Sequence, residues 1–173
     1  MKIVIKKLLN VENIDRAKYF AHPKLIAIDP GGNGGIVIYS LKTKEVVEVK
    51  KMPETPGELL SFLRIYSFSA RCYLEKVGGM PNNGGSRAFT FGRGFGHLEM
   101  ALLACRIPVV EVTPQKWQKA LQLGNKGRRT ETQWKTKLKE RAEQLFPEVG
   151  KITKATSDAL LILEYARLME KEK

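Results

Sequence analysis

The chain has 173 residues, of which 30 are Lys or Arg and 18 are Asp or Glu, so its formal net charge is +12. Apolar residues make up 43%, enough to bury the core of one compact domain. No apolar run reaches the length of about 18 residues that a membrane span needs, and the charged first residues lack the pattern of a secretory signal. Cys72 and Cys105 form neither a metal-ligand spacing nor a disulfide framework. These features disfavour an exported protein, a membrane protein and a zinc finger, and they predict a cytoplasmic protein with buried free thiols.

The positive charge lies mainly toward the two ends of the chain, because residues 25–113 are nearly balanced. Such a surplus favours a polyanionic partner, most often nucleic acid. A lysine-rich surface that only keeps a protein in solution would give the same count. Two basic clusters in Gly-containing segments favour the first interpretation, since they can follow phosphates without disturbing a core. They are formed by Lys126, Arg128 and Arg129 and by Lys151 and Lys154.

The pattern of apolar residues predicts one domain over residues 24–173, preceded by an extension over residues 1–23 that contains a strand at 2–5 or a short helix. The first strong signals are three strands connected by turns, an antiparallel meander. These strands read LIAID, GIVIYS and EVVEVKKM.

Five helices and two further strands are predicted after the meander. The helices span about 56–68, 87–105, 114–121, 130–147 and 157–169. A strand at 71–77 separates the first two helices, and a buried strand at 107–112 separates the second from the third. Thr130 and Gln133 form a capping box that starts the fourth helix. This order predicts an α/β fold with a mixed five-stranded sheet, an antiparallel meander followed by parallel strands, flanked by helices.

Three acidic residues lie at positions where a buried carboxylate needs a partner. Asp29 ends an apolar strand before Pro-Gly-Gly, Glu75 ends the strand that contains Cys-Tyr-Leu, and Asp158 lies in the first turn of the last helix. Asp29 could serve only as a turn residue and Asp158 only as a helix N-terminal acid, whereas a glutamate in an apolar strand needs a partner. If the three meet, they form an oxygen cage suited to Mg²⁺ or Mn²⁺. Two such ions about 4 Å apart can promote hydrolysis of a phosphodiester.

In their order and spacing these segments resemble the RuvC group of the RNase H-like nucleases, most closely its bacteriophage-type branch. The resemblance rests on AIDPGGNGG, YLEKV, MPNNGGSRAFTFGRGFGHLEMAL, IPVVEVTPQKWQKAL and SDALLILEYA, and it covers about residues 24–170. It implies an RNase H-like fold and an endonuclease that cuts four-way (Holliday) junctions in DNA by two-metal hydrolysis. It also implies that Asp29, Glu75 and Asp158 are the catalytic metal ligands, that Mg²⁺ is the cofactor with Mn²⁺ able to substitute, and that the enzyme is a homodimer.

The sequence departs from the family pattern at two places. Members of the family usually carry a fourth ligand, Asp or His, three residues before the final aspartate, and this chain has Ala155 there. Relatives from the bacterial branch place an aromatic residue in the loop after the glutamate, where this chain has Gly78, Gly79 and Met80. The first departure predicts a lower affinity for metal ions.

Candidates for DNA contact lie in the Gly-rich loop, on the helix that follows it and among the basic residues of the last third of the chain. They are Met80, Asn82, Asn83, Arg87, Arg93, Lys116, Lys126, Arg128, Arg129, Lys151 and Lys154. On that helix Gly92 and Gly96 share one face and each costs about 1 kcal/mol relative to alanine. Tight packing against a partner helix or close contact with a phosphate would offset this cost. Trp117 and Trp134 are predicted to be buried.

Other functions remain compatible with the sequence. A broader nuclease could cut other branched DNA, and a catalytically degenerate protein could bind junctions without cutting them. Asp-Pro-Gly-Gly before a strand also resembles the phosphate-binding hairpin of the actin and sugar-kinase ATPases, but that fold needs a much longer chain.

Overall fold

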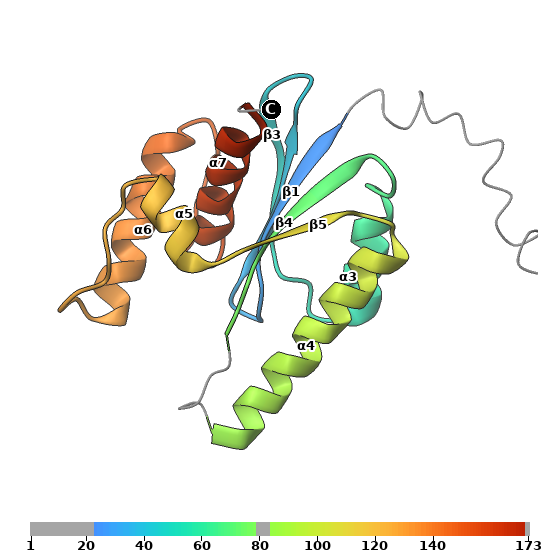
Figure 1. The fold of residues 1–173 in the computed structure, drawn as a ribbon, viewed down its shortest axis with the longest axis horizontal. Coiled ribbons are helices and arrows are strands. Elements are labelled where there is room, and N and C mark those ends of the chain that lie inside the picture. Colours follow the sequence, from blue (N-terminus) through green and yellow to red (C-terminus); the bar gives the residue numbers. More distant parts are fainter. Residues whose placement is uncertain (1–22, 79–83, 172–173) are drawn as a thin grey trace, which may run out of the picture.

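A computed structural model describes residues 23–78 and 84–171 of the chain (Figure 1). Its strands are β1 (Lys24–Asp29), β2 (Gly35–Ser40), β3 (Glu45–Lys51), β4 (Ala70–Glu75) and β5 (Val109–Val112). Its helices are α3 (Pro56–Arg64), α4 (Gly84–Ala104), α5 (Pro114–Ala120), α6 (Glu131–Leu145) and α7 (Ser157–Lys171). The predictions for the extension before Pro23 and for Met80, Asn82 and Asn83 lie outside the described residues.

The five strands form one mixed sheet in the order β3-β2-β1-β4-β5. β1 pairs antiparallel with β2, and β2 pairs antiparallel with β3. β1 and β4 are parallel, as are β4 and β5, because helices connect these strands in sequence. The predicted fold class is confirmed: an antiparallel meander is followed by parallel strands, with helices on both faces.

Successive strand residues point to opposite faces of the sheet, and a different group of helices covers each face. Ala27 and Tyr73 belong to the core under α5, α6 and α7, whereas Ile28 and Leu74 belong to the core under α3 and α4. Figure 1 shows the two groups of helices on either side of the sheet. None of the helices in the described part of the chain is long and apolar enough to cross a membrane.

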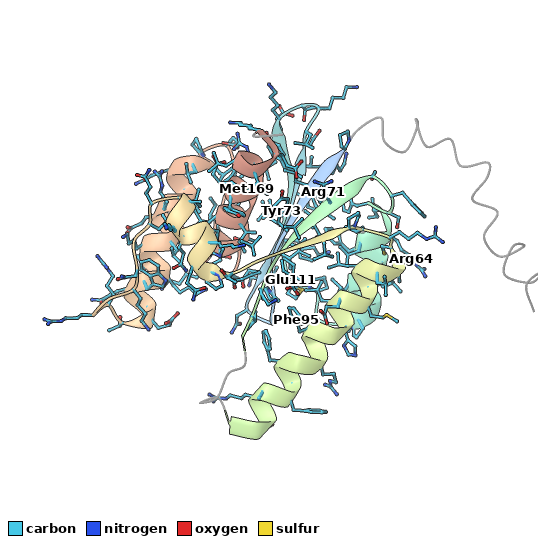
Figure 2. All side chains as sticks on the ribbon, in the orientation of Figure 1. Arg64, Arg71, Tyr73, Phe95, Glu111 and Met169 are labelled. Carbon is cyan, nitrogen blue, oxygen red and sulfur yellow. The ribbon has the colours of Figure 1, made fainter. Side chains whose placement is uncertain are left out.

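The direction of α7 is fixed by contacts at its carboxyl end. The Tyr73 hydroxyl donates to Glu170 Oε1 at 2.7 Å, and Arg71 Nη1 donates to the same oxygen at 3.0 Å. Figure 2 shows Arg71 and Tyr73 on β4 near Met169, which lies on the last turn of α7. Because Arg71 lies early in β4 and Glu170 lies late in α7, the helix runs antiparallel to β4. Its first turn therefore lies at the carboxyl ends of β1 and β4.

The burial predicted for the cysteines and tryptophans is confirmed, whereas the burial of β5 and the ends of some helices differ from the prediction. Cys72, Cys105, Trp117 and Trp134 are buried as predicted. β5 was expected to be a buried strand, but it is an edge strand in which only Val112 is buried. A short apolar run has the same sequence signature in both settings, so sheet order alone decides between them. The ends of the helices also differ from the predicted bounds, most of all at α3, which stops at residue 64, and at α4, which begins at residue 84.

Candidate active site

Two of the three predicted acids come from neighbouring parallel strands. β1 and β4 pair with Ile28 opposite Leu74, so Asp29 and Glu75 follow side by side where the two strands end. Asp29 lies two residues after Ala27, and Glu75 lies two residues after Tyr73. Strand alternation therefore directs both carboxylates toward the face that α7 covers. Asp158 reaches the same place from the first turn of α7 and is buried.

The glycines of the turn after Asp29 allow two segments to approach closely. A Cβ atom at Gly34 would collide with the carbonyl oxygen of Asp29. A Cβ atom at Gly35 would lie 2.8 Å from the carbonyl oxygen of Ala155, which is closer than real side chains come. The segment that leads into α7 therefore lies against the start of β2, because glycine leaves the space free. This places Ala155 beside the register partner of Asp29.

The carboxyl groups of Asp29 and Glu75 have raised pKa values because they are buried and because other acids lie near them. Burial raises the pKa of Asp29 to about 8, helped by the negative charges of Asp158 and Glu75 and by a hydrogen bond with the Glu75 carboxyl. Burial is also the main cause of a raised pKa at Glu75. Trp117 Nε1 donates to Glu75 Oε1 at 2.9 Å and opposes that rise. The sequence predicts only that Trp117 is buried, whereas in the structure its indole also fixes the orientation of the Glu75 carboxyl.

A lysine that the sequence analysis did not single out completes the cluster. Lys135 Nζ lies 2.6 Å from Asp158 Oδ2, and the Ser157 hydroxyl donates to Asp158 Oδ1 at 3.1 Å. Burial lowers the pKa of Lys135, but the carboxylates of Asp158, Asp29 and Glu75 outweigh that effect, so the net pKa is raised. The structure thus places one ammonium group among three carboxylates.

The position of Lys135 follows from the packing of α6. The Thr130–Gln133 capping box fixes the first turn of the helix, and Trp134 and Leu138 bury its apolar stripe against α7. Lys135 is the neighbour of Trp134 and lies three residues before Leu138, so it borders the stripe. The sequence does show that Lys135 lies at the edge of the apolar stripe of this helix. It does not show that Asp158 lies opposite the lysine.

The described ranges, 23–78 and 84–171, contain no group of three or more His, Cys, Asp or Glu side chains arranged to hold a metal ion. Asp158 explains this result in part, because both of its oxygens already accept hydrogen bonds from Lys135 and Ser157. Asp29 and Glu75 differ, since they are two neighbouring carboxyl groups whose pKa values are raised mainly by burial and also by the charge of Asp158. Carboxylate oxygens suit Mg²⁺ and Mn²⁺. The chemistry of these two donors therefore fits a divalent ion.

No protein-family model matches the chain, and a search of curated proteins finds no match. Solved structures do match. RuvC of T. thermophilus in complex with a Holliday junction substrate aligns with a TM-score of 0.58 at 17% identity, over 85% of this chain and 96% of that chain. A second structure of Thermus thermophilus RuvC gives 0.53 at 17%, over 84% and 96%. The chain has a RuvC-like fold.

Within this RuvC-like fold the loop between α5 and α6 carries exposed basic side chains near the acids. Arg128 is exposed, Lys126 Nζ pairs with Glu131 Oε2 at 2.8 Å, and Arg129 Nη1 donates to the Asn125 carbonyl at 3.4 Å. The loop passes directly into α6, and five residues of helix rise only about 7.5 Å. The start of α6, where the loop ends, therefore lies about 7.5 Å along the helix axis from Lys135.

The other basic candidates of the RuvC-like fold are exposed on three separate segments. Lys116 lies on α5, and Lys151 and Lys154 lie in the segment before α7. Arg87 and Arg93 on α4 line a cavity of about 480 Å³, whose wall also includes Gly31 and Gly32 from the turn after Asp29. The cavity therefore connects the basic side of α4 to the turn that bears Asp29.

The outer face of α4 is apolar and uncovered. Phe89, Met100 and Leu103 are 69%, 63% and 71% exposed. Gly92 and Gly96 lie on the same face, and no atom lies within 4 Å of a Cβ built at either. Nothing among the described residues offsets the cost of these glycines. We call this set of five residues the α4 stripe.

Proposed function

We propose that this chain is a structure-selective, divalent-metal-dependent DNA endonuclease that resolves four-way junctions. The observation that carries the proposal is the convergence of Asp29, Glu75 and Asp158 at one end of the sheet of a RuvC-like fold. RuvC of T. thermophilus, which was solved in complex with a Holliday junction substrate, supports the choice of substrate. The basic side chains around the acids supply the field that a polyanionic substrate needs.

Each residue of the site has a role in this reaction. Asp29 and Glu75 would hold the cation, and the hydrogen bond from the Trp117 indole fixes the orientation of the Glu75 carboxyl. Bound divalent ions supply Lewis acidity to a phosphate oxygen and make water a better nucleophile. The family resemblance predicts two ions, with Asp158 as the third ligand.

Junction preference follows from the placement of positive charge rather than from base contacts. The loop between α5 and α6 and the basic side of α4 belong to elements on opposite faces of the sheet (Figure 1). Two basic surfaces at a fixed angle, formed by this loop and by α4, would bind the bent arms of a junction better than a straight duplex. A protein that binds in this way recognises shape and places one phosphate at the acids.

Replacing Arg128 and Arg129 by Gln is expected to weaken junction binding and reduce its salt dependence. Each lost phosphate contact reduces the log-log salt slope by about one unit. The measurement is the dissociation constant of a catalytically inactive protein over a salt series. Lys42→Gln with Lys44→Asn is the matched control. It also removes two positive charges, but from the turn between β2 and β3, at the end of β2 that is remote from Asp29. An unchanged slope in the arginine variant would exclude contact with phosphates.

We also propose that the enzyme is a homodimer that pairs through the α4 stripe. Small residues let two helices approach closely, and the exposed apolar side chains on either side of the glycines would be buried by a second copy. A dimer would present two acidic sites to one junction, which allows two strands to be nicked together.

Met100→Glu with Leu103→Glu is therefore expected to give a monomer that nicks one strand at a time. Ile65→Glu is the control, because Ile65 is 71% exposed but lies after α3, away from the stripe. Sedimentation equilibrium measures the mass, and a supercoiled cruciform plasmid separates single nicks from paired cuts. A dimeric double variant would reject this interface.

The central test is cleavage of a synthetic four-way junction and of a linear duplex with the same sequence, each with Mg²⁺, Mn²⁺ or EDTA. We expect cleavage of the junction with either metal and none with EDTA. Equal cutting of flaps and forks would indicate a broader branched-DNA nuclease. Tight junction binding without cleavage would indicate a catalytically degenerate protein, an alternative that Ala155 favours.

A further inference from the structure

We infer that this site takes one divalent ion, held by Asp29 and Glu75, and that the Lys135 ammonium supplies the second positive charge, at Asp158. The inference deepens the proposed function and rests on it. It replaces the two-ion reaction implied by the family resemblance with one ion and a cation that belongs to the chain.

Charge balance is the first argument. Where the fourth ligand is Asp, the site has four carboxylates, and two divalent ions neutralise their four negative charges. Here Ala155 stands at the position of the usual fourth ligand, and Lys135 adds a positive charge to three carboxylates. The net charge of the ionised site is therefore two negative units, which one divalent ion neutralises. A second ion would be repelled by the first and by the ammonium.

The geometry at Asp158 is the second argument. One carboxylate oxygen accepts from Lys135 Nζ at 2.6 Å and the other from the Ser157 hydroxyl at 3.1 Å. The Asp158 side chain is only 7% exposed and that of Lys135 is 33% exposed, so water competes weakly with the pair. A metal ion could bind Asp158 only by displacing a short, partly buried ion pair.

The rigidity of the lysine is the third argument. Lys135 lies on a capped helix whose neighbouring residues, Trp134 and Leu138, are packed in the core with α7. An ammonium group has three donor protons, of which Asp158 accepts one. The remaining protons can donate to a phosphate oxygen placed between Asp158 and the ion. Lys135 then stabilises the charge that develops on the phosphate, and the packing holds it ready before the substrate arrives.

The test measures metal binding and cleavage separately, on the full chain. Titration calorimetry with Mn²⁺ should show one ion per wild-type chain. Lys135→Gln should bind that ion about tenfold more tightly, because a repelling charge is gone, yet lose cleavage of the four-way junction at saturating Mn²⁺. Lys139→Gln is the matched control, because Lys139 lies one turn further along α6 and pairs with Glu143 at 2.6 Å. It should change neither quantity.

A double variant makes the inference stricter. Ala155→Asp with Lys135→Gln restores a fourth carboxylate and removes the ammonium, so it should bind two Mn²⁺ ions per chain. Thermal unfolding without metal checks that each variant folds. Two ions in the wild-type protein, or an unchanged Mn²⁺ affinity in Lys135→Gln, would overturn the inference. If the stoichiometry and affinities are as expected but no protein cuts branched DNA, the proposed function fails and the cation assignment stands.

Discussion

Asp29→Asn should lower junction cleavage by roughly a thousandfold or more, because it removes a proposed ligand of the divalent ion that the proposed reaction needs. Junction binding should be kept or become tighter, since a negative charge near the scissile phosphate is lost. The amide has nearly the shape of the carboxyl group, so the protein should remain folded. The measurement is a single-turnover rate with saturating Mg²⁺, together with a dissociation constant measured in EDTA.

Glu45→Gln is the control for this experiment, because it also removes one negative charge but lies at the exposed start of the edge strand β3. Its cleavage rate should equal that of the wild-type protein. A wild-type rate in Asp29→Asn would remove Asp29 from the chemistry and with it the proposed site. Loss of binding in parallel with loss of cleavage would indicate a structural role instead.

Without divalent ions the protein should become less stable as the pH rises from about 4 to about 8. The pKa of Asp29 is raised from 3.8 to about 8 in the folded chain, so in this range the folded state holds a proton that the unfolded state has released. Unfolding then releases a proton, and raising the pH favours it by up to about 1.4 kcal/mol per pH unit. Urea unfolding in EDTA at several pH values measures this slope.

Two comparisons assign the slope to Asp29. In Asp29→Asn no carboxyl at this position titrates, so the decline over the same range should be largely lost. Saturating Mg²⁺ should stabilise the wild-type protein more at pH 8 than at pH 5, because the ion competes with the proton for the carboxylate. A decline of equal size in Asp29→Asn would place the titrating group elsewhere.

The elements that position the acids were predictable because their signals are local. LIAID followed by Pro-Gly-Gly marks a buried strand that ends at Asp29, and Thr130 with Gln133 marks the start of α6. The order of strands and helices then implies the mixed sheet. Parallel pairing of β1 and β4 places two strand-end acids together, so even the meeting of Asp29 and Glu75 follows from topology.

What the sequence did not show depends on contacts between distant segments. Lys135 and Asp158 are 23 residues apart, and Trp117 and Glu75 are 42 apart. In each pair, no sequence pattern around one residue indicates that the other is its partner. The exposure of β5 likewise depends on its place at the edge of the sheet. The bacteriophage-type branch, the bound ions and the dimer stay predictions.

The residues of the site come from two layers of the fold, the sheet and the helices on one of its faces. Asp29 and Glu75 come from the sheet, whereas Asp158, Lys135 and Trp117 come from the helices packed on one face. A nascent chain that has formed its strands but not yet docked these helices has no assembled centre. The proposed cleavage activity would therefore require the helices to be docked on the sheet, and a chain with the sheet alone would lack it.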